Sequence, residues 1–83
     1  MFFVYVLTSI NHNRFYIGFT SNLSRRLREH NSGKTKSTKG YAPWEMLFSE
    51  TYDTREQARK REVYLKSGIG REYIKNWPYS STG

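Results

Sequence analysis

Two short runs of β-branched and aromatic residues near the start of the chain constrain its fold more than any other feature. Residues Phe2–Thr8 and Arg14–Phe19 have the composition of strands, and Ser9–Asn13 between them is typical of a turn. The pair therefore predicts a β-hairpin. Because side chains alternate between the two faces of a strand, Tyr5 and Tyr16 are expected on one face. The other face is expected to carry Val4, Val6, Phe15, Ile17 and Phe19.

The rest of the chain predicts one more strand and three helices. The expected elements are a helix from Leu23 to about Asn31, a strand over Trp44–Thr51, a helix from a capping box at Asp53–Thr54 to about Lys66, and a helix over Gly70–Trp77. This β-β-α-β-α-α order predicts an α+β fold, with helices flanking a small three-stranded antiparallel sheet. The 83 residues are expected to form one domain over residues 1–78, with a frayed tail over residues 79–83.

Composition excludes several classes of protein. The chain has no cysteine, which excludes a disulfide scaffold, a thiol nucleophile and a zinc site built on thiolates. It has no run of about 18 apolar residues, so it is not expected to cross a membrane. The N-terminus has neither the basic segment nor the cleavage site of a secretory signal, which favours an intracellular, cytoplasmic protein.

The charge balance favours a polyanionic partner. Fourteen lysines and arginines against seven acidic residues give a net charge of +7. Up to Phe48, seven basic minus two acidic residues give +5, and from Ser49 seven minus five give +2. The segment Lys34–Gly40 contains three lysines and no apolar residue, and it predicts a mobile basic loop. Such a surface attracts nucleic acid, although small proteins are often basic for other reasons.

One carboxylate falls where burial is expected. Four residues of the second predicted helix share the face that should pack on the core: Ala58, Glu62, Leu65 and Ile69. A buried carboxylate is costly unless it is paired or bound to a cation. Glu62 therefore indicates a functional group, an ion pair, for instance with Arg26, or a carboxylate partly solvated at the edge of the apolar face. Val63 competes to define the apolar face.

The first predicted helix carries an arginine and a histidine beside its apolar side. Arg26 lies one turn before His30, so the two groups together could hold a phosphate. The alternatives are an arginine stem that lies along the flank of the helix and a histidine at the surface or the helix end. Arg25 and Arg28 point to other sides and are expected to be solvated.

The tyrosine face and the acidic residues limit the chemistry of a site. Tyr5 and Tyr16 are expected to be cross-strand neighbours, a pairing that usually serves packing. Gly18 leaves this face open beside Tyr16, where a ligand could approach. No acidic pair has the spacing of a metal site, so an ion would be held by one carboxylate and water, which suits Mg²⁺.

These residues together resemble the GIY-YIG nuclease superfamily. Phe3-Val4-Tyr5 and Tyr16-Ile17-Gly18 correspond to the two halves of its motif, with Phe3 in place of the first glycine. Arg26, ten residues after the second tyrosine, and Glu62 in the late helix also match. The resemblance covers Phe2 to about Trp77 and is closest to the small single-domain GIY-YIG proteins of bacteria.

The resemblance implies an endonuclease that hydrolyses DNA phosphodiester bonds with one Mg²⁺ or Mn²⁺ ion bound by Glu62. The family includes homing, restriction and DNA repair enzymes, so repair or recombination is an expected setting. The implied catalytic residues are Tyr5, Tyr16, Arg26, His30 and Glu62, with either tyrosine as the base. Contacts with DNA are expected from Arg14, Arg25, Arg28, Lys34, Lys36, Lys39 and Asn76. Because no targeting domain accompanies these residues, low sequence specificity is expected, or recognition of branched or damaged DNA.

Two other functions agree with the sequence. The first is a nucleic-acid-binding module without catalytic activity. The second is a protein-interaction domain that uses an exposed aromatic patch formed by Trp44, Tyr73, Trp77 and Tyr79.

Overall fold

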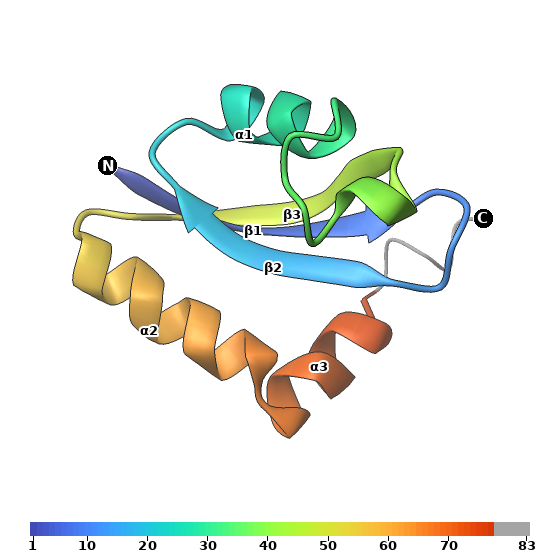
Figure 1. Ribbon diagram of the computed structural model, residues 1–83. Coiled ribbons are helices and arrows are strands. Elements are labelled where there is room, and N and C mark those ends of the chain that lie inside the picture. Colours follow the sequence, from blue (N-terminus) through green and yellow to red (C-terminus); the bar gives the residue numbers. More distant parts are fainter. Residues whose placement is uncertain (78–83) are drawn as a thin grey trace.

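The structure, a computed structural model, describes residues 1–77 and contains the elements in the predicted order (Figure 1). The strands are β1 (Phe2–Ser9), β2 (Phe15–Thr20) and β3 (Trp44–Tyr52). The α-helices are α1 (Leu23–Asn31), α2 (Arg55–Lys66) and α3 (Gly68–Lys75), and a short 3-10 helix, η1 (Lys39–Tyr41), precedes β3. The predicted α+β class is confirmed. The tail predicted over residues 79–83 lies outside the described residues.

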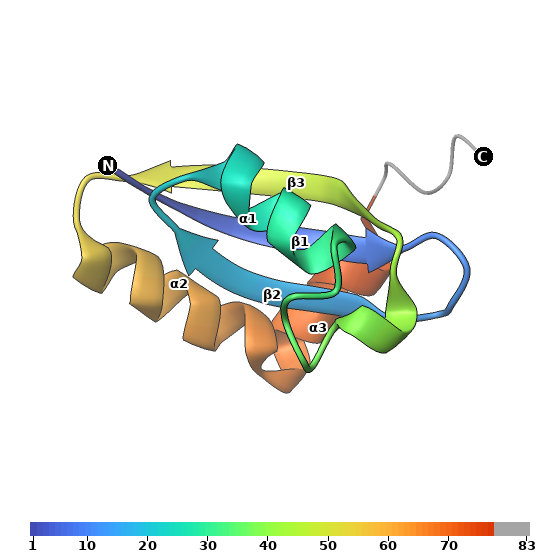
Figure 2. The same cartoon turned by 45° about the horizontal axis from the view of Figure 1, so that its top comes forward.

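The central strand of the antiparallel sheet is β1, in the order β2-β1-β3. Helix α1 covers one face of the sheet, and α2 and α3 cover the other (Figure 1 and Figure 2). The hairpin register pairs Tyr5 with Gly18 and Leu7 with Tyr16, so the two tyrosines share one face, as predicted. They are diagonal cross-strand neighbours with ring centroids 6.2 Å apart, which confirms the expected neighbourhood.

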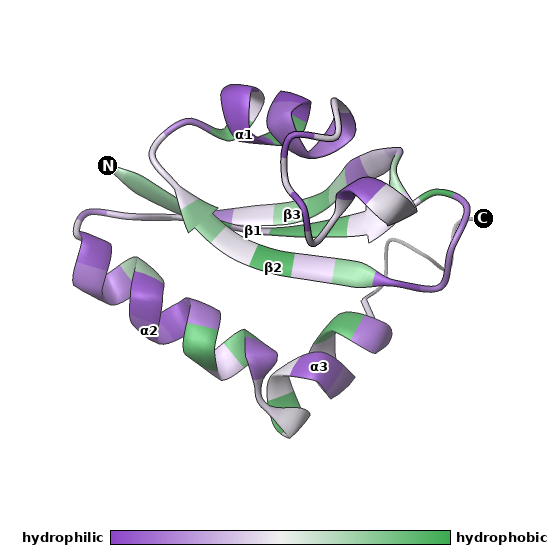
Figure 3. Cartoon of the chain, in the orientation of Figure 1, coloured by the Kyte–Doolittle hydropathy of each residue, from purple (hydrophilic) through white to green (hydrophobic). Residues whose placement is uncertain are grey.

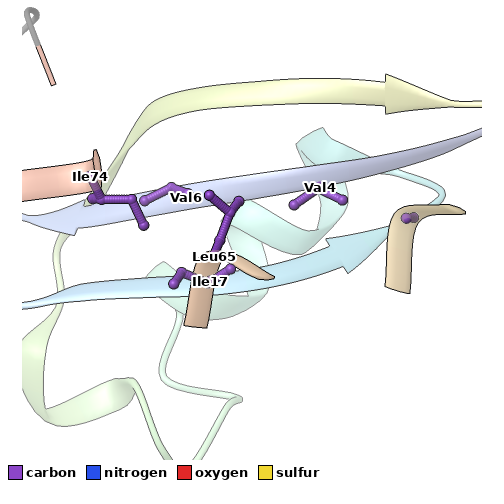
Figure 4. Packing of buried hydrophobic residues seen from close by; sticks show 6 residues of the cluster. Val4, Val6, Ile17, Leu65 and Ile74 are labelled. Atoms are coloured by element: carbon purple, nitrogen blue, oxygen red, sulfur yellow. The ribbon is translucent and has the colours of Figure 1, made fainter. Parts of the chain in front are cut away.

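The hydrophobic core lies between the sheet and the pair of helices α2 and α3. Figure 4 shows five side chains of this cluster, Val4, Val6, Ile17, Leu65 and Ile74. Ala58 of α2 belongs to the same cluster. Phe15 and Phe19 pack against this cluster, so the predicted apolar face of the hairpin is confirmed. Figure 3 shows that α1, on the opposite face, is mostly hydrophilic. Within the described residues, no helix is long and apolar enough to span a bilayer.

The boundary between α2 and α3 differs from the prediction. The Ser67 side chain accepts a hydrogen bond from the Gly70 N–H at 3.2 Å, so it caps α3, which begins at Gly68. Ile69 therefore belongs to the first turn of α3 and is 73% exposed, and its expected place on the buried face of α2 was wrong. The predicted capping box at the start of α2 is present, formed by Thr54 and Gln57.

The buried face of α2 otherwise follows the prediction. Ala58 and Leu65 are fully buried, whereas Val63 is exposed and does not define the face. Glu62 lies between the two buried residues in the sequence, and its side chain is only 13% exposed. The carboxylate is therefore at the edge of the core.

The segment predicted to be a mobile loop is anchored instead. Thr38 is 1% exposed, and the backbone N–H groups of Thr38 and Lys39 donate to the Thr35 carbonyl at 3.1 and 3.0 Å. The Trp44 indole N–H donates to the Thr38 carbonyl at 2.9 Å. The lysines of the loop are exposed, and the polar threonine supplies the anchor that apolar residues usually provide.

Replacing Gly70 by alanine is expected to destabilise the fold by about 3 kcal/mol, because the new methyl group cannot be accommodated. A Cβ at this position would overlap the Tyr64 carbonyl oxygen and the Leu65 Cα, both of which are backbone atoms. Gly68→Ala is the matched control, since nothing lies within 4 Å of a Cβ there. Urea denaturation measures the difference, and equal midpoints for the two variants would contradict the packing at the α2–α3 junction.

Candidate active site

A buried tyrosine fills the space above Gly18. Tyr5 is 2% exposed, and a Cβ added at Gly18 would lie 2.6 Å from its hydroxyl oxygen and 2.8 Å from its Cζ. Only glycine allows the phenol to lie there. The open space expected beside Tyr16 is thus occupied by Tyr5, and that expectation was wrong.

His30, near the end of α1, is fully buried against this tyrosine. Its Nε2 lies 3.0 Å from the Tyr5 hydroxyl, and its Nδ1 lies 2.8 Å from the Thr38 hydroxyl. The ring centroids of Tyr16 and His30 are 4.7 Å apart. His30 is therefore a buried polar group with a partner for each ring nitrogen, and the alternative of a surface histidine was wrong.

Burial controls the titration of the tyrosine and the histidine. It raises the pKa of Tyr5 to about 12, while hydrogen bonding and charge from Arg26 act in the opposite direction. Burial also lowers the pKa of His30, and the positive charge of Arg26 lowers it further. At neutral pH the pair therefore consists of a neutral phenol and a neutral imidazole.

Arg26 lies beside the buried pair, with one third of its side chain exposed (33%). Its Nη1 donates to Glu29 Oε1 at 2.8 Å, so the ion pair considered between Arg26 and Glu62 is replaced by one within α1. Hydrogen bonding and charge both connect Arg26 to Tyr5. The exposed part of the planar guanidinium keeps donors that can bind a phosphate.

Glu62 lies on the helix that covers the opposite face of the sheet from α1 (Figure 1). It belongs to α2, and its carboxylate lies 3.6 Å from Arg59 Nε and 3.3 Å from Lys66 Nζ. Burial is the main cause that raises the pKa of Tyr5, and the charge of Tyr16 adds to it. The negative charge of Glu62 raises this pKa further, so the carboxylate acts on the phenol electrostatically. Its hydrogen bond in the described part of the chain is with Lys66. The structure thus brings Tyr5, Tyr16 and His30 into contact, whereas Arg26 and Glu62 influence Tyr5 through their charges.

A metal ion would have one carboxylate to bind at this site. Residues 1–77 contain no group of three or more histidines, cysteines or acidic residues that could hold an ion. The partners of Glu62, Arg59 and Lys66, are exposed side chains on flexible stems that can move aside. A single carboxylate fits Mg²⁺, which keeps several of its water ligands when it is bound.

Three of the predicted DNA contacts line one groove. Arg25, Arg28 and Lys34 surround a depression of about 330 Å³ together with Glu29 and Ser32. Arg25 is exposed and lies 3.7 Å from Glu29. The groove is formed by residues of α1 and of the segment that follows it.

The remaining predicted contacts with DNA are more dispersed. Lys36 and Lys39 are exposed on the loop before β3. Arg14, in the hairpin turn, lies over the Tyr41 ring at 4.9 Å from its centroid. The Asn76 amide donates to the Glu72 carbonyl at 3.0 Å and caps α3, which covers the other face of the sheet. The structure therefore does not bring Asn76 to the tyrosines.

The predicted aromatic patch is only partly formed. Trp44 is buried, which removes it from the patch. Tyr73 and Trp77 line a groove on α3, and the Trp77 ring stacks on Phe48 with centroids 4.2 Å apart. Tyr79 lies outside the described residues.

Sequence patterns did not reveal two residues that support the site. Thr38 contacts His30 from the loop, and the Asn31 amide holds the backbone of Trp44 by donating to its carbonyl and accepting from its N–H. Neither residue has a periodic pattern, because one lies in a loop and the other ends a helix. The sequence signal that could have indicated Thr38 is a threonine among lysines in a segment without apolar residues.

The burial of His30 predicts a loss of stability in acid. Because its folded pKa lies below the ordinary value of about 6.5, the unfolded chain binds the proton first as pH falls. The free energy of unfolding should therefore decrease below about pH 6.5, by at most about 1.4 kcal/mol per pH unit from this group. Urea denaturation between about pH 5 and pH 7.5 measures the slope. His30→Gln should lack this component, and an unchanged slope in that variant would contradict it.

The fold and the tyrosine hairpin define the family of the protein. The family model described as the GIY-YIG catalytic domain matches residues 1–74, from the hairpin to the last full turn of α3. The chain therefore belongs to the GIY-YIG nuclease family.

Its relatives include several small proteins of one group. The chain is 40% identical over 55 residues to the UPF0213 protein YazA of Bacillus subtilis, covering 65% of this chain and 56% of that one. It is 35% identical over 74 residues to a UPF0213 protein of Staphylococcus epidermidis, covering 88% and 89%. The solution NMR structure of a UPF0213 protein from Bacillus halodurans superimposes with a TM-score of 0.55 at 30% identity, covering 99% of this chain and 94% of the other. These names specify no substrate.

Proposed function

We propose that this protein is an endonuclease that hydrolyses DNA phosphodiester bonds with the help of one divalent cation. The observation that supports the proposal most strongly is the cluster of Tyr5, Tyr16, His30 and Arg26 on one face of the sheet, with Glu62 in electrostatic range. Phosphodiester hydrolysis needs an activated water, a neutralised phosphate and a stabilised leaving oxygen. These side chains offer the groups for each of the three requirements.

Arg26 is the group that would bind the scissile phosphate. Its guanidinium is always charged, and it can donate to the equatorial oxygens, whose negative charge grows in the transition state. Glu29 holds one end of the guanidinium at 2.8 Å, so the side chain is oriented before DNA binds. Orientation in advance is what makes such a donor effective in catalysis.

The two tyrosines would have different roles in activating the attacking water. Tyr16 is partly exposed, so its hydroxyl would meet the attacking water, whereas Tyr5 is buried against His30. A phenol is a weak base at neutral pH, and the adjacent charge of Arg26 assists by stabilising the phenolate. His30 Nε2, 3.0 Å from the Tyr5 hydroxyl, would accept a proton passed on from the tyrosine pair.

Glu62 would hold a Mg²⁺ or Mn²⁺ ion together with water ligands. When bound, such an ion neutralises charge on the phosphate and on the departing oxygen. The exposed basic groups near α1 and on the loop before β3 would contact DNA phosphates without distinguishing bases. We therefore expect low sequence specificity, and branched or damaged DNA from repair or recombination is a suitable substrate.

A gel assay with plasmid, single-stranded and branched DNA tests the proposal. Each substrate is incubated with the protein in Mg²⁺, in Mn²⁺ or in a chelator. We expect cutting of at least one substrate in the presence of the ion and none in the chelator. A mobility shift without cutting would favour the non-catalytic binding module. The absence of both cutting and a mobility shift would favour a protein-interaction domain. Both outcomes would overturn the proposal.

A further inference from the structure

The loop that carries the exposed lysines also contributes a polar contact inside the site. Thr38 is buried, and its hydroxyl lies 2.8 Å from His30 Nδ1. The same hydroxyl donates to the Thr35 carbonyl at 3.3 Å. A hydroxyl has one proton, so donation to the carbonyl leaves its lone pairs to accept the Nδ1–H of the imidazole.

The opposite ring nitrogen meets a group that needs an acceptor. The Tyr5 hydroxyl is buried, and within residues 1–77 its hydrogen-bond partner is His30 Nε2 at 3.0 Å. Arg26, whose charge acts on Tyr5, has only donors and cannot accept the phenol proton, which leaves that proton for the imidazole. The hydrogen bonds at both ring nitrogens are therefore satisfied by the same tautomer, with the proton on Nδ1.

We propose that Thr38 is a positioning residue that holds neutral His30 in the Nδ1–H tautomer, with Nε2 free to accept the proton of Tyr5. Its role in cleavage rests on the proposed function, whereas the tautomer does not. The opposite tautomer would point an N–H at Tyr5 and could not take its proton. The choice of tautomer thus decides whether the imidazole can act as a proton acceptor for the tyrosine pair.

The position of Thr38 is itself fixed by the surrounding structure. The Trp44 indole N–H donates to its carbonyl at 2.9 Å, and its N–H donates to the Thr35 carbonyl at 3.1 Å. Trp44 is in turn held by the amide of Asn31 at the end of α1. The hydroxyl is therefore presented to His30 by a packed segment and not by a freely moving loop.

NMR of the histidine ring nitrogens tests the assignment, because the two tautomers give different nitrogen shifts and couplings. In the wild-type protein we expect the proton of neutral His30 on Nδ1. Thr38→Val keeps the shape but removes the hydroxyl, and we expect it to shift His30 to a mixture of tautomers; Thr38→Ser should restore the wild-type pattern. Exposed His12 serves as an internal reference, and Ser37→Ala removes an exposed hydroxyl from the same loop as a matched control.

Single-turnover cleavage provides the second readout. Thr38→Val should slow it by about 10- to 100-fold, a range typical when the hydrogen-bond partner that orients a histidine is removed, and Thr38→Ser should recover most of the rate. Wild-type His30 with its proton on Nε2 would overturn the inference, even if Thr38→Val did not fold. So would an unchanged tautomer in a folded Thr38→Val protein. If the Nδ1–H tautomer is found but no DNA is cut, the proposed function fails and the assignment of Thr38 stands.

Discussion

Replacing Glu62 by glutamine is expected to abolish metal-dependent cleavage while DNA binding survives. The substitution removes the charge that would hold the ion and keeps the shape of a side chain that is 13% exposed beside the core. Loss of the charge stabilisation supplied by an ion, several kcal/mol, corresponds to a rate lower by about 10³-fold or more. Single-turnover cleavage measures the rate, and a mobility shift measures the binding.

The matched control for this prediction is Glu56→Gln. Glu56 is an exposed carboxylate in the first turn of the same helix, so the variant has the same change in net charge without touching the core. It should cut at the wild-type rate. Cleavage that persists in Glu62→Gln, or falls equally in both variants, would remove Glu62 from the role of metal ligand.

Arg26→Ala is expected to slow single-turnover cleavage by about 10²- to 10³-fold, the usual effect of losing one donor that stabilises transition-state charge. The expectation follows from its place beside Tyr5 and from the orientation imposed by Glu29. The rate is measured with protein in excess over DNA, so that a weaker affinity does not contribute. Arg55→Ala removes one exposed arginine from α2 and should retain the wild-type rate. An unchanged rate in Arg26→Ala would make this arginine structural.

The arrangement of the hairpin could be predicted because it depends on local rules. A period of two along Phe2–Thr8 and Arg14–Phe19 puts Tyr5 and Tyr16 on one face, and the register confirms this. The burial of Ala58 and Leu65 follows in the same way from the helical period. These patterns were sufficient to predict a three-stranded sheet, the order of the elements and part of the core, although Ile69 was wrongly placed there.

Other features depend on contacts between distant residues and could not be predicted from periodicity. The expected loop was anchored because Thr38 meets His30, eight residues away, and Trp44. The face expected to be open beside Tyr16 was filled because Tyr5 lies directly opposite Gly18, thirteen positions later in the chain. The predicted role of Asn76 was not matched by its position, since its amide caps its own helix. In each case a side chain finds its partner only after the elements have packed.

Paramagnetic NMR with Mn²⁺, recorded with duplex DNA bound, tests most directly whether one ion-binding pocket unites α2 with the tyrosine face. The account predicts that Mn²⁺ broadens the signals of Glu62 together with those of Tyr5 and Gly18, and that Glu62→Gln removes this broadening. Broadening centred on other carboxylates, such as Glu72 on α3, or no broadening near Glu62 and the tyrosines, would contradict it.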